Sequence, residues 1–78
     1  MGNIPTLKGK DFLKYLLKFN CKLIDDNGSH HTLVNLQNNK HSVVAFHGGN
    51  DIKPIMFKTV LKQLDINLEE FLKFIYKK

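Results

Sequence analysis

Apolar residues near the start of the chain recur at the spacing of an amphipathic helix. Between residues 8 and 19 they stand three or four positions apart, and lysines recur every fourth position beside them. This pattern predicts a helix over 8–19, preceded by a loose leader over 1–7 in which Pro5 marks irregular backbone. The stripe expected to be buried consists of Phe12, Leu13, Leu16, Leu17 and Phe19.

The middle of the chain has the shorter apolar runs that are typical of strands. We expect a short strand at 22–24, ended by an acidic turn over 25–28, and an alternating strand at 30–36. The polar stretch 37–40 predicts a second turn, and 41–46 predicts a third strand. Because successive strands joined by tight turns pair side by side, these segments predict an antiparallel meander.

Two further helices are expected after the strands. Proline suits a first helical turn, so Pro54 predicts a helix that runs to about Leu64. Asn67 is a typical N-cap, and Glu70 stands three residues later, where it could reach back to the start of the last helix. The residues expected to be buried are Phe57, Val60, Leu61 and Leu64 on the first helix and Leu68, Phe71, Leu72 and Ile75 on the second.

The order helix, three strands, helix, helix predicts an α+β fold whose helices cover one face of the sheet. With 78 residues, residues 1–78 are expected to form a single domain. No apolar run approaches the roughly 20 residues of a membrane-spanning helix. The lone Cys21 excludes an internal disulfide and favours a reducing, cytoplasmic compartment.

The charge of the chain favours an anionic partner. The formal net charge is +5, and all twelve basic residues are lysines. Contacts to phosphate would therefore come from ammonium groups rather than from bidentate guanidinium groups.

Candidate chemistry concentrates in Gly28-Ser29-His30-His31, at the start of the predicted second strand. Gly28 and Ser29 would form a tight turn, and a histidine near neutral pH can take or give a proton. Because strand side chains alternate, only one of His30 and His31 can face a given site, and the alternation of the following residues does not decide which one. This arrangement suggests acid–base chemistry on a phosphodiester.

A second group of candidates lies before the predicted helix at Pro54. His47 could approach a phosphate or the reacting histidine, and Lys53 stands at a helix N-terminus, which attracts phosphate through its amides. His41 reads as a solvated strand residue. A zinc site is not expected, because His30 and His31 diverge and Cys21 stands alone.

A serine nucleophile is also not expected. The Gly-Ser-His order lacks the second glycine of a nucleophile elbow, and Ser29 opens a strand rather than joining a strand to a helix.

From Lys10 to Phe71 the chain resembles the HicA toxin family, the small ribonucleases of type II toxin–antitoxin modules. No single matching segment is rare, but their order and spacing together are specific. The matching segments are Lys10-Asp11-Phe12-Leu13-Lys14-Tyr15-Leu16, Gly28-Ser29-His30-His31, Val43-Val44-Ala45-Phe46-His47-Gly48-Gly49, Ile52-Lys53-Pro54, Thr59-Val60-Leu61-Lys62-Gln63-Leu64 and Glu69-Glu70-Phe71-Leu72.

The resemblance implies a double-stranded-RNA-binding-domain-like α-β-β-β-α fold, here with an additional short C-terminal helix. It implies metal-independent cleavage of mRNA in the cytoplasm, without a cofactor, and neutralisation by a HicB-type antitoxin. The family's catalytic histidine maps onto His30, and the expected substrate-binding residues are Gly28, Ser29, His31, His47 and Lys53.

The sequence does not decide which group protonates the leaving oxygen: His31, His47 and a water molecule are the alternatives. The acidic pair Asp25-Asp26 stands where family chains often carry a basic residue and would repel phosphate locally. Two alternatives remain for the chain as a whole: a non-catalytic RNA-binding module of the same fold, and a pure interaction adaptor that binds no RNA.

Overall fold

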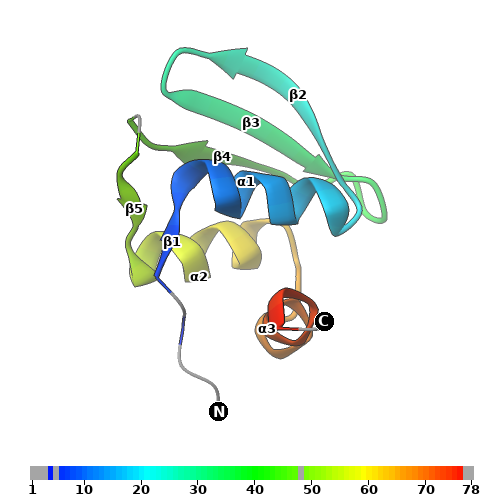
Figure 1. Cartoon of the computed structure of the whole chain (residues 1–78). Helices are drawn as coiled ribbons and strands as arrows, with labels where there is room; N and C mark the ends of the chain where they lie inside the picture. The colour runs from blue at the N-terminus through cyan, green and yellow to red at the C-terminus, as the bar shows by residue number, and fades with distance from the viewer. Residues whose placement is uncertain (1–3, 5, 48, 77–78) are drawn as a thin grey trace.

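Figure 1 shows a computed structural model of the chain, which describes residues 4, 6–47 and 49–76. Strands and helices follow one another in the predicted order, with two additional very short strands. The elements are β1 (Leu7–Lys8), α1 (Gly9–Lys18), β2 (Cys21–Asn27), β3 (His30–Asn35), β4 (His41–Ala45), β5 (Asp51–Ile52), α2 (Pro54–Gln63) and α3 (Leu68–Tyr76).

The predicted antiparallel meander is confirmed, because β2, β3 and β4 are neighbours in that order in one three-stranded sheet. The acidic turn over 25–28 was placed wrongly, since Asp25 and Asp26 pair with Thr32 and His31 and belong to β2. A glycine at the first position of a two-residue loop lets both strands continue up to the turn. The polar residues are tolerated because β2 is an edge strand.

A second sheet, which the hydrophobic pattern did not predict, joins the two ends of the fold. Leu7 pairs with Ile52 and Lys8 with Asp51 in an antiparallel ladder of two residues per strand. The leader prediction was therefore wrong for Leu7, and residues 1–3 and 5 of that leader lie outside the described residues. Strands of two residues are too short to leave an alternating pattern, so only the tertiary structure reveals them.

The predicted helix boundaries are close to the observed ones. Pro54 occupies the first turn of α2, and Oδ1 of Asn67 accepts a hydrogen bond from the backbone N–H of Glu70 at 3.0 Å, which confirms the predicted cap of α3. One expected core position was wrong: Leu17 is 41% exposed. A helix turns by about 100° per residue, so Leu17 points away from the face that buries Leu16.

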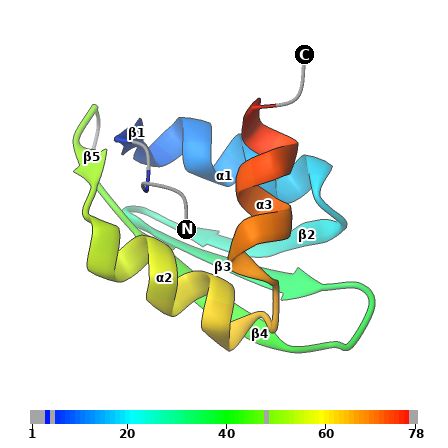
Figure 2. The same ribbon diagram turned by 90° about the horizontal axis from the view of Figure 1, so that it is seen from below.

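The helices lie on one side of the three-stranded sheet and leave its other face open (Figures 1 and 2). Phenylalanines join the three helices: the ring of Phe12 on α1 stacks on Phe57 of α2 at 4.8 Å, and Phe71 of α3 meets both rings, at 6.0 and 5.7 Å. All three are fully buried. This is the expected α+β arrangement of the double-stranded-RNA-binding-domain type, with the extra helix α3 packed on the helical layer.

Hydrogen bonds tie the far end of the sheet to the end of α2. Nδ2 of the buried Asn35 donates to the carbonyl oxygen of Leu64 at 2.8 Å, and Nδ2 of Asn38 donates to the same oxygen at 3.2 Å. Oγ of Ser42 donates to Oε1 of Gln63 at 2.6 Å. Because these bonds hold α2 along β4, they also place the start of that helix.

The phenylalanine contacts predict that Phe71→Ala removes a large share of the stability. Truncating a buried phenylalanine costs about 3–5 kcal/mol, against a total of about 5–15 kcal/mol for a small domain. Urea unfolding followed by circular dichroism measures the loss. Tyr76→Ala, on the same helix but 58% exposed, is the matched control and should change the unfolding free energy by less than about 0.5 kcal/mol. Equal losses in the two variants would contradict this assignment.

Candidate functional site

The turn between β2 and β3 presents His30 to solvent. Asn27 and His30 are paired, so Gly28 and Ser29 alone form the loop, and Gly28 has a φ of 63°. This left-handed conformation favours glycine, which explains why the motif begins with that residue. The ring of His30 is exposed, and its Nδ1 lies 3.5 Å from Oγ of Ser29, at the outer limit of a hydrogen bond.

His30 lies on the open face of the sheet. Its cross-strand partner is Ala45 on β4, and the backbone N–H of Phe46 donates to the carbonyl oxygen of Ser29 at 3.0 Å, which continues the ladder by one pair. His47 comes two residues after Ala45, just past the end of β4. The structure therefore brings His30 and His47 to one corner of the sheet.

A cavity of about 330 Å³ adjoins this corner, between the end of β4 and the start of α2. Ala45, which faces His30 across the strands, is part of its wall. His47 and Lys53 also line it, together with Asn50, Ile55 and Met56. Two residues that the sequence singled out separately, His47 and Lys53, thus share one concave surface beside His30.

The start of α2 makes this cavity suitable for an anion. Lys53 is the N-cap and Pro54 follows it, so the backbone N–H groups of Ile55 and Met56 are the first amides of the helix and have no acceptor within it. Both residues line the cavity. The exposed Lys53 adds a positive charge to the partial positive charge of the helix N-terminus.

His31 lies on the opposite face of β3, turned toward the helices. The residue is 9% exposed, and its ring stacks on Phe46 with 4.5 Å between the ring centres. Nδ1 of His31 lies 2.9 Å from Oδ1 of Asp26, although it makes no hydrogen bond of good geometry among the described residues. The structure therefore places His31 on the opposite face of the sheet from His30.

Phe46 and Gly9 complete the site, although the sequence did not single out either residue as functional. A Cβ atom at Gly9 would lie 2.1 Å from Cγ of Phe46, so the ring occupies the space that a side chain at position 9 would need. The N–H of Gly9 also donates to the carbonyl oxygen of Asn50 at 3.1 Å, and the N–H of Asn50 donates to that of His47 at 3.0 Å. The sequence carries one sign of this contact, a glycine at the start of a helix. A glycine at such a position has several other common explanations, so it does not identify the contact.

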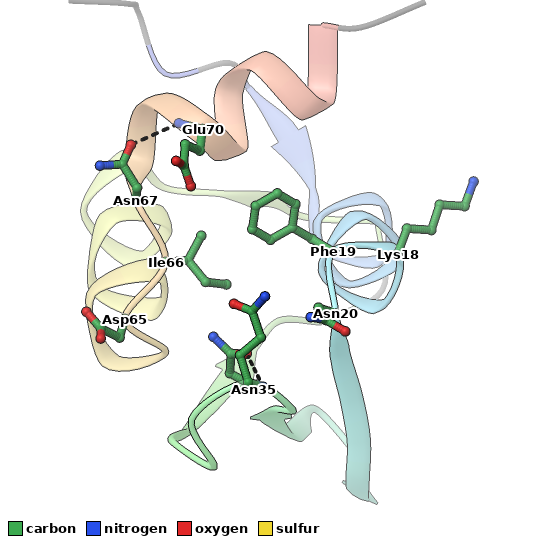
Figure 3. Close-up of a pocket in the computed structure, with 9 residues that line it drawn as sticks. Lys18, Phe19, Asn20, Asn35, Asp65, Ile66, Asn67 and Glu70 are labelled. Carbon is green, nitrogen blue, oxygen red and sulfur yellow. Dashed lines mark hydrogen bonds between the residues drawn. The ribbon is translucent and has the colours of Figure 1, made fainter.

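A second cavity, of about 360 Å³, lies at the other end of the sheet and is shown in Figure 3. Most of the residues that line it are polar, and two of them hold the fold together: Asn35 donates to Leu64, and Asn67 caps α3. The cavity lies at the end of β3 opposite to His30.

The remaining candidate chemistry is not assembled into a site. Burial raises the pKa of the Cys21 thiol, which disfavours the reactive thiolate. Within residues 4, 6–47 and 49–76, no three His, Cys, Asp or Glu side chains lie close enough to hold a metal ion together. His41 is exposed at the start of β4, at the opposite end of that strand from Ala45.

No helix in the described part of the chain has the length and apolar character needed to cross a membrane. Among known families, the model of the HicA toxin of bacterial toxin–antitoxin systems matches residues 9–66. The match includes His30, His47 and Lys53. Comparison with curated proteins and with solved structures gave no match.

The contact between Gly9 and Phe46 predicts that Gly9→Ala destabilises the protein. Overpacking of this kind costs about 1–3 kcal/mol, since the added methyl group must displace the ring. Urea unfolding measures the loss. Gly49→Ala is the control: no heavy atom lies within 4 Å of the added Cβ, so the unfolding free energy should change little.

A double-variant cycle tests the cause of that loss. In a Phe46→Ala background, Gly9→Ala should cost much less than in the natural chain, because the ring that the methyl group displaces is gone. An equal cost in both backgrounds would show that the contact with Phe46 is not responsible.

Proposed function

The chain belongs to the HicA toxin family of bacterial toxin–antitoxin systems, and on this basis we propose that it is a metal-independent endoribonuclease whose acid–base residue is His30. The proposal depends on the position of the His30 ring, which is exposed on the open face of the sheet. Its cross-strand partner Ala45 lines a cavity that is also lined by His47, by Lys53 and by residues with free helix amides. An accessible imidazole can act as a general acid–base group, and an anion-binding surface beside it can stabilise the charge on the phosphate during cleavage of a phosphodiester.

In the proposed reaction, His30 takes the proton from a ribose 2′-hydroxyl group. The 2′-oxygen attacks the adjacent phosphorus, the bond from phosphorus to the 5′-oxygen breaks, and a 2′,3′-cyclic phosphate forms. A second group protonates the departing 5′-oxygen. We assign this second role to His47, because it follows Ala45, the cross-strand partner of His30, and lines the adjoining cavity, whereas the ring of His31 lies on the buried side.

The other predicted site residues have supporting roles in this proposal. Lys53 and the amides of Ile55 and Met56 stabilise the negative charge that builds up on the phosphate. Gly28 and Ser29 form the turn that directs His30 outward. His31 contributes by positioning: it packs on Phe46 beneath the strand that carries His30, which keeps the hairpin in place.

We propose mRNA in the cytoplasm as the target, so that cleavage arrests translation, and a HicB-type antitoxin as the protein that neutralises the activity. Family membership supports a toxin that is paired with an antitoxin. The net charge of +5 supports an anionic substrate. The reaction needs no cofactor in this scheme, because both proton transfers are made by side chains of the chain itself.

We expect His30→Gln to abolish toxicity on expression and to slow RNA cleavage by the purified protein at least about 100-fold, the usual contribution of a general acid–base group. Cleavage is measured on RNA in the presence of EDTA, and circular dichroism checks that the variant is folded. A folded, expressed variant that remains fully toxic would move the catalytic role away from His30.

His41→Gln is the matched control for this prediction. His41 is also an exposed histidine on the sheet, but it lies at the far end of β4 from the proposed site. Its replacement should leave cleavage unchanged. If natural protein binds RNA but cuts none of it, the alternative of a non-catalytic RNA-binding module holds instead.

A further inference from the structure

The outer edge of β4 is free to pair with another strand. Among the described residues, β4 pairs only with β3. The bond from Phe46 to Ser29 fixes the phase of the ladder, so Ser42 and Val44 bond to β3, whereas Val43 and Ala45 turn their backbone N–H and C=O groups outward.

The two edges of the sheet differ in their protection against such pairing. β2 carries charged residues and a bulge between Leu23 and Asp25, devices that discourage the addition of a strand. β4, His41–Ala45, contains no lysine, proline or acidic residue, and its ladder is regular. The β4 edge is therefore the one suited to receive a further strand.

A groove of about 750 Å³ runs beside this edge, between β4 and α2. Val43 on β4 is 45% exposed and Ile55 on α2 is 75% exposed, and Met56, Thr59 and Val60 continue the helix side of the groove. His41 lines the groove at the start of β4, but no lysine and no Phe or Tyr ring does. Single-stranded RNA binds to cationic grooves with aromatic platforms, so this surface suits the apolar side chains of a protein segment better than nucleobases.

The exposed rim of α2 is basic. Lys58 is a helical neighbour of Ile55, three residues apart, and Lys62 is in the same way a neighbour of Thr59. Both lysines are exposed and border the residues that line the groove. A segment that binds here gains from carboxylates along the side that meets α2.

The groove leads into the proposed catalytic site, because Ile55 and Met56 line both the groove and the cavity that contains His47 and Lys53. A strand that pairs with Val43 and Ala45 would end beside Ala45, the cross-strand partner of His30, at the mouth of the cavity that Ala45 lines. It would thus obstruct the approach of RNA without touching the buried side of the sheet.

From these observations, and resting on the proposed toxin function, we propose that the antitoxin binds through an extended segment with alternating apolar and acidic side chains. This segment adds a strand to the free edge of β4, fills the groove between β4 and α2, and closes the cavity at His47 and Lys53.

The test uses the full chain with His30→Gln, which makes binding measurable independently of cleavage. The probe is the protein encoded by the reading frame adjacent to the gene of this chain. Val43→Glu should weaken its binding by at least about 30-fold, because the new carboxylate would be buried in the groove against apolar side chains of the segment. Isothermal titration calorimetry measures the affinity.

Ile24→Glu is the matched control. Ile24 is 48% exposed on the opposite edge strand, so the same chemical change is made on the same sheet, away from the groove. The affinity of the Ile24→Glu variant for the probe protein should stay within a factor of about three of that of the parent chain. Hydrogen exchange of the complex should also show that the amides of Val43 and Ala45 become protected at least about tenfold, whereas those of β2 do not.

Three outcomes would overturn the proposal. The first is equal weakening by both substitutions, or no binding of the probe protein at all. The second is a dimer of the isolated chain in sedimentation that Val43→Glu dissociates, which would assign the edge to a second copy. The third is a loss of RNA binding by Val43→Glu with unchanged antitoxin binding. Toxicity that survives His30→Gln would instead refute the proposed function and leave the binding result standing.

Discussion

The candidate site depends on the placement of one aromatic ring, that of Phe46, between Gly9 and His31. On one side the ring fills the space that a side chain at the start of α1 would occupy, and on the other it stacks on His31 at 4.5 Å. Because His31 is held on the buried side, the alternation of the strand turns His30 outward. The same start of α1 holds the backbone of Asn50, and through it the segment that carries His47.

This arrangement also changes the meaning of the acidic pair in the hairpin. From the sequence alone, Asp25 and Asp26 were expected to repel a phosphate backbone together. In the structure the alternation of β2 separates them: Asp25 lies opposite Thr32 on the open face, whereas Asp26 lies opposite His31 and contacts its ring nitrogen at 2.9 Å. Only one of the two carboxylates therefore faces the side where RNA would bind, and the other serves the support beneath it.

The small size of the domain makes β4 serve two purposes. Its C-terminal end, at Ala45, contributes to the proposed catalytic corner, and its outer edge borders the groove on α2. A partner that binds to the outer edge of β4 is thus adjacent to the proposed catalytic site without any movement of the fold. The bonds from Ser42 to Gln63 and from Asn35 to Leu64, which hold α2 against the sheet, maintain both surfaces at once.

The sequence by itself determined the order of the main helices and strands, the cap at Asn67, the buried faces of α2 and α3, and the exposed turn at Gly28, because each of these is written in local spacing and in the conformational preferences of single residues. It also placed His30, His47 and Lys53 among the candidates. Only the tertiary structure decided which of His30 and His31 faces outward, that β2 continues through the acidic pair, that Leu7 pairs with Ile52, and that His47 and Lys53 share a cavity. These features depend on contacts between residues far apart in the chain, on the strand register and on the placement of the Phe46 ring. The local sequence pattern does not predict any of these.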